Sequence, residues 1–90
     1  MKIYANNNWV VGEPYTFNKQ HNGLIINNEE TDNILKVVAS DIYSVYIDDL
    51  IIYNKDKAIK NVIGGKTYIA VNLDDVIARI DLEEGEDNNG

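Results

Sequence analysis

Short aliphatic runs alternate with turn-forming residues along most of the chain, and this pattern constrains the fold more than any other feature. Valine, isoleucine and tyrosine dominate the apolar residues, and all three favour strands. No apolar stripe with helical spacing lasts longer than about two turns. The runs expected to form strands are residues 9–12, 34–39, 47–54, 58–63 and 66–71, with Gly64-Gly65 as the turn before the last. The sequence therefore predicts an all-β domain, either a small barrel or a sandwich.

The segment LDDVIARI, residues 73–80, allows two interpretations that the sequence leaves open. In the first, Asp74 or Asp75 caps a single helical turn. In the second, residues 76–80 form a last strand that places Val76, Ala78 and Ile80 on one face.

The 90 residues are sufficient for one small domain, because chains split into domains only well above this size. We expect this domain to span residues 1–82 and to be followed by a disordered acidic tail at 83–90. The chain has no cysteine, which excludes disulfides and thiolate metal sites. A domain of this size is marginally stable alone, so association with further copies is an open option.

The formal net charge of −7 limits the partners that the chain can bind. Neutralising phosphates requires a basic surface, which argues against a nucleic-acid-binding protein. The N-terminal residues MKIYANNNWVV lack the apolar core and the cleavage site of a signal peptide. No apolar run approaches the roughly 18 residues that a membrane helix needs. We therefore expect a cytoplasmic protein that binds neither nucleic acid nor membranes.

Residue types that carry catalysis or bind metals are scattered rather than clustered. His21 is the only histidine, and a lone histidine in a polar interval is usually a solvated surface residue. Neighbours on a strand point to opposite faces, so adjacent carboxylates rarely act as a catalytic pair; they occur at Glu29-Glu30, Asp48-Asp49 and Asp74-Asp75. The sequence IGGK lacks the spacing of a phosphate-binding loop. We therefore predict a binding or structural protein, not an enzyme, with no cofactor, metal site or catalytic residue.

An apolar triplet, Leu24-Ile25-Ile26, lies inside the polar interval KQHNGLIINNEET. The flanking residues favour a loop, whereas the triplet is typical of a buried strand. From the residues alone the internal strand is the favoured interpretation, and a loop that exposes the triplet is the alternative.

The order of these features resembles that of the GroES-like co-chaperonins, from Met1 to about Asp81. That family opens with M-x-I-x-P-L-x-D-R-V-x-V, whose register is kept in MKIYANNNWVV. Its flexible loop ends in G-G-I-V-L, similar to NGLII here, and its next strand, G-x-V-x-A-V-G, is loosely matched by NILKVVA. Its V-G-D-x-V-x-F/Y is similar to IDDLIIY, in which Asp48 replaces the glycine. The closest match is GGKTYIAVNLDDVIARI, against D-G-E-E-Y-L-I-L-x-E-S-D-I-L-A-V-V.

Two departures from the family pattern affect what can be carried over. The sequence Ala5-Asn6-Asn7-Asn8-Trp9 stands in place of Pro-Leu-x-Asp-Arg, so the contacts of that Asp and Arg are not expected here. Only seven residues, 40–46, replace the longer hairpin that forms the roof of the family's dome. A divergent member with a reduced roof is similar to phage-encoded co-chaperonins.

The resemblance implies an irregular GroES-like β-barrel with a long mobile loop at about residues 14–31, assembling into a heptameric ring. Its function would be to cap a GroEL-type chaperonin and to assist ATP-dependent protein folding, with the nucleotide chemistry on the chaperonin. The implied chaperonin-binding residues are Gly23, Leu24, Ile25 and Ile26. The implied subunit-interface residues are Ile3, Val76, Ile77, Ala78 and Ile80, for which the alternative is the core of a closed monomer.

A second function from a different class remains open. The acidic composition also fits a monomeric β-barrel adaptor or inhibitor that presents an acidic face to a basic protein partner. The two hypotheses differ in the oligomeric state that they predict.

Overall fold

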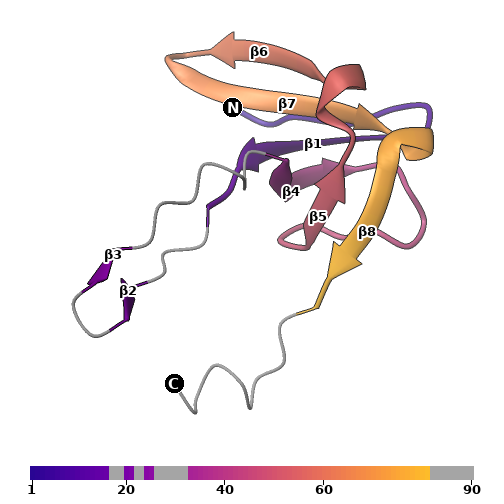
Figure 1. Cartoon of the computed structure of the whole chain (residues 1–90). Helices are drawn as coiled ribbons and strands as arrows, with labels where there is room; N and C mark the ends of the chain where they lie inside the picture. Colours follow the sequence, from indigo (N-terminus) through magenta and orange to yellow (C-terminus); the bar gives the residue numbers. More distant parts are fainter. Residues whose placement is uncertain (17–19, 22–23, 26–32, 82–90) are drawn as a thin grey trace.

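The chain folds into one curved antiparallel sheet and a second, very small one (Figure 1). The computed structural model describes residues 1–16, 20–21, 24–25 and 33–81. The large sheet has the strand order β6-β7-β1-β4-β5-β8, and its members are β1 (Trp9–Pro14), β4 (Ile34–Ser40), β5 (Leu50–Tyr53), β6 (Ile59–Ile63), β7 (Lys66–Asn72) and β8 (Val76–Ile80). The small sheet pairs β2 (Gln20–His21) with β3 (Leu24–Ile25). The all-β prediction is confirmed, while the closed GroES-like barrel stays a prediction.

Both open interpretations of residues 73–80 are partly correct, because a 3-10 turn, η3 (Leu73–Asp75), leads directly into β8. The predicted cap is wrong. The side chain of Asn72 accepts a hydrogen bond from the Asp74 backbone nitrogen at 3.0 Å, so the cap lies one residue before the turn. An asparagine also caps η2 (Lys55–Lys57). The Asn54 side chain accepts a hydrogen bond from the Asp56 backbone nitrogen at 3.1 Å.

The core cluster draws on β1, β4, β5 and β7; in β1 and β7 its buried residues alternate with half-buried positions. Its fully buried side chains are Val10, Leu35, Val37, Ile51 and Val71. Cross-strand pairing explains this grouping, because Val10 lies opposite Val71 and Leu35 lies opposite Ile51. The connection from β4 to β5 adds two buried residues, Ile42 and Val45, to the same cluster.

Gly12 lies at a β-bulge in β1 where the backbone of β4 comes unusually close. A Cβ atom at this position would lie 2.4 Å from the Lys36 carbonyl oxygen and 2.6 Å from Leu35 Cγ. Glycine is therefore required for packing here.

A tight turn separates the first residues from β1. The backbone nitrogen of Trp9 donates to the Asn6 carbonyl at 3.0 Å, and Asn7 and Asn8 both have positive φ, 55° and 67°. Asparagine tolerates this left-handed conformation better than most residues, so the asparagine run fits the turn. The Asn8 nitrogen donates to Asp41 Oδ2 at 2.8 Å, which fixes the turn to the β4–β5 connection.

Two further predictions, the acidic tail and the absence of a membrane helix, concern residues that the structure describes only in part or not at all. The predicted acidic tail, 83–90, lies outside the described residues. Within the described ranges, no helix has the length and apolar character needed to cross a membrane.

Candidate functional site

The residues predicted to bind a chaperonin, 23–26, lie in the sequence between β1 and β4 of the large sheet. Leu24 and Ile25 form β3, whereas Gly23 and Ile26 lie outside the described residues. In the small sheet Leu24 lies opposite His21 and Ile25 lies opposite Gln20, so neither apolar residue has an apolar cross-strand partner. Figure 1 shows β2 and β3 set apart from the large sheet.

The sheet topology bears on the interpretation of Leu24-Ile25-Ile26 as an internal strand. β3 pairs with β2 and is not a member of the six-stranded sheet, which contains the core. Leu24 and Ile25, the two described members of the triplet, thus form a strand, but this strand is not part of the large sheet. The two strands of the small sheet extend from the domain instead of completing it.

The two ends of this segment are held next to each other. The Tyr15 nitrogen donates to the Ile34 carbonyl at 3.0 Å, and the Tyr53 nitrogen donates to the Asn33 carbonyl at 3.1 Å. Pro14, at the approximate start of the predicted mobile loop, belongs to β1 and pairs with Leu35. The described residues that flank this segment, Tyr15 and Ile34, are therefore hydrogen-bonded to each other.

The predicted interface residues near the C-terminal end lie on an edge strand. β8 pairs with β5 on one side, and within the described chain no strand pairs with its other side. Ile77 is 65% exposed, and Ala78 is also exposed, whereas Val76 and Ile80 are half-buried. The prediction of one common face is only partly correct, since a register shift between Ile52 and Tyr53 interrupts the pairing with β8.

Ile3, the other predicted interface residue, precedes the asparagine turn and is half-buried. Residues 1–5 line a cavity of about 400 Å³ together with residues of β1, β4 and β7, including Glu13 and Tyr68. Ile3 and β8 thus belong to different parts of the surface, one over the middle of the sheet and one at its edge.

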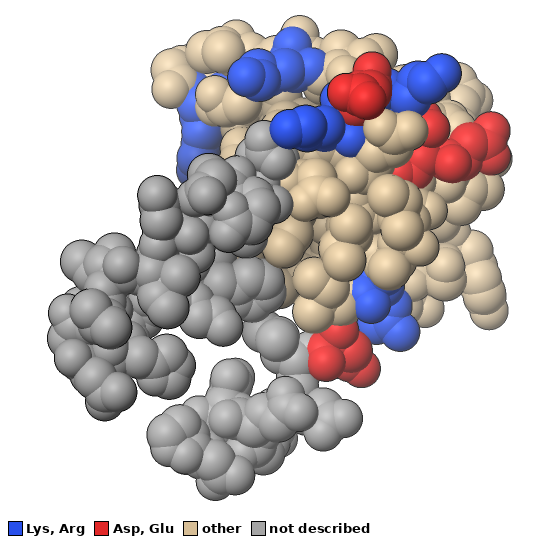
Figure 2. Space-filling model, viewed as in Figure 1, with Lys and Arg blue, Asp and Glu red and all other residues tan. Residues whose placement is uncertain are grey.

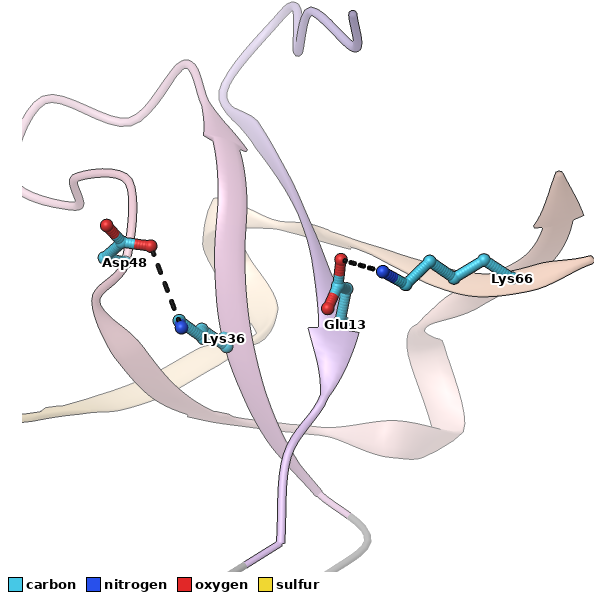
Figure 3. Close-up of polar contacts among 4 residues, drawn as sticks. All are labelled: Glu13, Lys36, Asp48 and Lys66. Carbon is cyan, nitrogen blue, oxygen red and sulfur yellow. Dashed lines mark ion pairs between the residues drawn. The ribbon is translucent and has the colours of Figure 1, made fainter. Parts of the chain in front are cut away.

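Among the described residues, two ion pairs join neighbouring elements (Figure 3). Lys66 Nζ lies 3.2 Å from Glu13 Oε2, which joins β7 to β1. Lys36 Nζ lies 4.0 Å from Asp48 Oδ1, which joins β4 to the turn before β5. Both pairs are solvent-accessible, and pairs of this kind contribute at most about 1 kcal/mol to stability.

Several of the described aspartates lie in turns. Asp49 Oδ2 accepts from the Tyr46 nitrogen at 2.9 Å, and Asp74 and Asp75 lie in η3. Among the described residues, no three His, Cys, Asp or Glu side chains lie close enough together to hold a metal ion. That the protein is not an enzyme and needs no cofactor stays a prediction.

Comparison with known proteins adds no assignment: no family model matches the chain, and a search of curated proteins finds no significant match.

Sequence reasoning assigned no role to the lysines between residues 55 and 66. This stretch contains Lys55, Lys57, Lys60 and Lys66, four of the eight basic residues, and a single acidic residue, Asp56. Its local charge of +3 in a chain of net charge −7 is the signal that would have drawn attention to it.

Proposed function

We propose that this protein is a GroES-like co-chaperonin that caps a GroEL-type chaperonin through residues 23–26. The observation that supports the proposal is the position of Leu24 and Ile25 in a small sheet separate from the six-stranded sheet, opposite polar residues. In our proposal, the apolar side chains of this segment are buried on the chaperonin.

The free energies of apolar burial and of loop ordering support weak binding by each single subunit. Burying three aliphatic side chains contributes roughly 1.5–3 kcal/mol each, or about 4–9 kcal/mol together. Ordering each residue of a loop costs about 1–2 kcal/mol, so a loop of several residues offsets most of this gain. Several linked copies would then bind tightly as a group while each contact remains easy to release.

A ring requires two different surfaces on each subunit, because head-to-tail contacts close a ring only when the two sides differ. In our proposal the exposed edge of β8, including Ile77, forms one of these surfaces, and the segment that contains Ile3 forms the other. The unpaired side of β8 offers backbone groups that a neighbouring chain can pair with.

The conformation of Asp48 agrees with the alignment behind the proposal. The resemblance places a family glycine at this position, and Asp48 has a φ of 78°, in the region that favours glycine. It occupies the third position of the turn from Tyr46 to Asp49, which is closed by a 3.0 Å hydrogen bond between the backbone groups of these residues.

The test is co-elution of the purified protein with a GroEL-type chaperonin, with and without adenine nucleotide, combined with native mass spectrometry. We expect the protein to form a ring whose co-elution with the chaperonin depends on adenine nucleotide. In Ile25→Asp the ring should persist while chaperonin binding is lost, whereas Ile77→Asp should weaken the ring.

A matched control is Val62→Asp, since Val62 is 66% exposed on β6, at the opposite edge of the sheet. This variant should keep both the ring and chaperonin binding. A monomer at all protein concentrations, with no chaperonin binding, would reject the proposal in favour of the adaptor or inhibitor.

A further inference from the structure

The strand β6 forms one edge of the large sheet, and all of its residues are exposed. It pairs with β7 on one side, and no other strand of the described chain pairs with its free side. Alternate residues of an edge strand direct their backbone N–H and C=O groups away from the neighbouring strand. Figure 1 shows β6 along the upper margin of the molecule. The strand therefore offers a row of backbone groups to which a further strand can be added.

The side chains of β6 are largely apolar although the strand is exposed. Val62 is 66% exposed, Ile59 is 50% exposed and Ile63 is 42% exposed. Ile59 and Val62 are three positions apart on the strand, so they lie on opposite faces of the β6–β7 hairpin. A strand added to this edge would therefore find apolar neighbours on both of its faces.

The charge around β6 is opposite to that of the whole chain. Residues 55–66 contain four lysines and a single acidic residue, in a chain of net charge −7. Lys66 already pairs with Glu13 at 3.2 Å, whereas Lys57 and Lys60 form no ion pair with another described residue. Figure 2 shows blue lysine and arginine side chains gathered near the top of the molecule, over the region of β6 and η2. The edge is therefore suited to a partner of negative charge.

The lysines also discriminate between the possible occupants of this edge. Lysine on an edge strand opposes the pairing of two copies along the same edge, because like charges would meet. A nucleic acid would be attracted by the charge, but it cannot form the backbone ladder that the free edge offers. An extended polypeptide with carboxylate side chains matches both the backbone groups and the charge.

We propose that β6 binds an extended acidic segment of another protein, which adds a strand to the large sheet and places carboxylates near Lys57 and Lys60. The apolar side chains of that segment would contact Ile59 and Val62. This site is independent of the proposed function, because Leu24, Ile25 and β8 do not belong to this edge.

The experiment is a titration of the fluorescein-labelled peptide Glu-Val-Glu-Val-Glu-Val with the full-length protein, followed by fluorescence anisotropy. One comparison peptide has lysine in place of glutamate, which reverses the charge. Another has proline in place of valine, which keeps the charge but removes backbone donors. A short single-stranded thymidine oligonucleotide provides negative charge without a polypeptide backbone. We expect each of these probes to bind at least about tenfold more weakly than the first peptide.

The variant Lys57→Gln/Lys60→Gln should weaken binding of the acidic peptide by about fivefold, as expected for solvent-accessible charge pairs. The matched control is Lys36→Gln/Arg79→Gln, which removes two exposed positive charges from β4 and β8. Its affinity should stay within about twofold of the unaltered protein, because charge at a distance is screened by salt. Val62→Asp should weaken peptide binding by about tenfold or more, because it places a carboxylate on the edge itself.

The acidic residues that follow β8 are a possible competitor for this edge within the same chain. Glu83→Gln/Glu84→Gln/Glu86→Gln removes three of their charges, and peptide affinity should change by less than about threefold. A larger gain in affinity would mean that the edge already holds the chain's own acidic segment, which would overturn the proposal. The proposal is also overturned if the acidic peptide does not bind, if any comparison probe binds as well, or if the control variant loses as much affinity as the substitution of the two lysines beside β6.

Discussion

The tripeptide Leu-Ile-Ile occurs twice in this chain, and the two copies have different positions in the fold. Leu50-Ile51-Ile52 lies in β5, between β4 and β8, and Ile51 is completely buried. In the other copy, Leu24 and Ile25 form β3, which pairs with β2 and lies outside the large sheet. Composition and strand propensity are identical in the two copies, so neither property determines whether the triplet becomes core.

The two copies differ in the residues that lie opposite them on neighbouring strands. Leu50 has Lys36 and Ile80 as cross-strand neighbours, and Ile51 has Leu35 opposite it in β4. The first triplet has only His21 and Gln20 opposite its described residues. The buried triplet therefore has a paired strand on each side and an apolar residue opposite each of its members in at least one of them, whereas the described residues of the first triplet lie opposite polar residues of β2.

The largest effect is expected at the centre of the buried triplet. Ile51→Ala should lower the free energy of unfolding by about 2–5 kcal/mol, because it removes fully buried methyl and methylene groups and leaves a cavity. Urea denaturation measures this loss. Ile52→Ala, at a half-buried position of the same strand, is the control and should cost clearly less. Equal losses at the two positions would contradict the burial difference.

A smaller loss is expected from filling the space that Leu35, the partner of Ile51, occupies beside β1. Gly12→Ala should destabilise by about 1–3 kcal/mol, because its Cβ has no room against Leu35 and the Lys36 carbonyl. Thermal unfolding is the measurement. Gly65→Ala separates packing from backbone strain, since Gly65 has a φ of 83° but no atom within 4 Å of the added Cβ. Its cost should be limited to about 1 kcal/mol of strain.

The core strands could be predicted from the sequence because their apolar runs are bounded by turn residues. The positions of the Gly64-Gly65 turn, of β4 and of β7 follow from this local pattern. The position of Leu24 and Ile25 in the fold could not be predicted in this way, because an apolar run can pair either with a distant strand or, as here, with the nearby residues Gln20 and His21. The bulge at Gly12 also arises from contacts between strands, which a single sequence does not display.

The turn before the buried triplet should respond to substitution in the stabilising direction. Asp48→Gly should raise the free energy of unfolding by about 0.5 kcal/mol, because glycine adopts positive φ without the Cβ penalty. The lost ion pair with Lys36 offsets little, since it spans 4.0 Å at the surface. Thermal unfolding of Asp48→Gly and Asp48→Asn separates the two terms. A loss of stability shared by both variants would show that the ion pair matters more than the backbone conformation.

The smallest effect on stability is expected in the triplet outside the core. Ile25→Ala should leave the free energy of unfolding within about 0.5 kcal/mol of the unaltered protein, because Ile25 belongs to no strand of the large sheet. Urea denaturation alongside Ile51→Ala compares the same substitution in the same tripeptide. A loss of about 2 kcal/mol or more at Ile25 would mean that this residue is buried within its own chain. It would then have no exposed side chain to offer a chaperonin, so this measurement tests the premise of the proposed function without needing the partner.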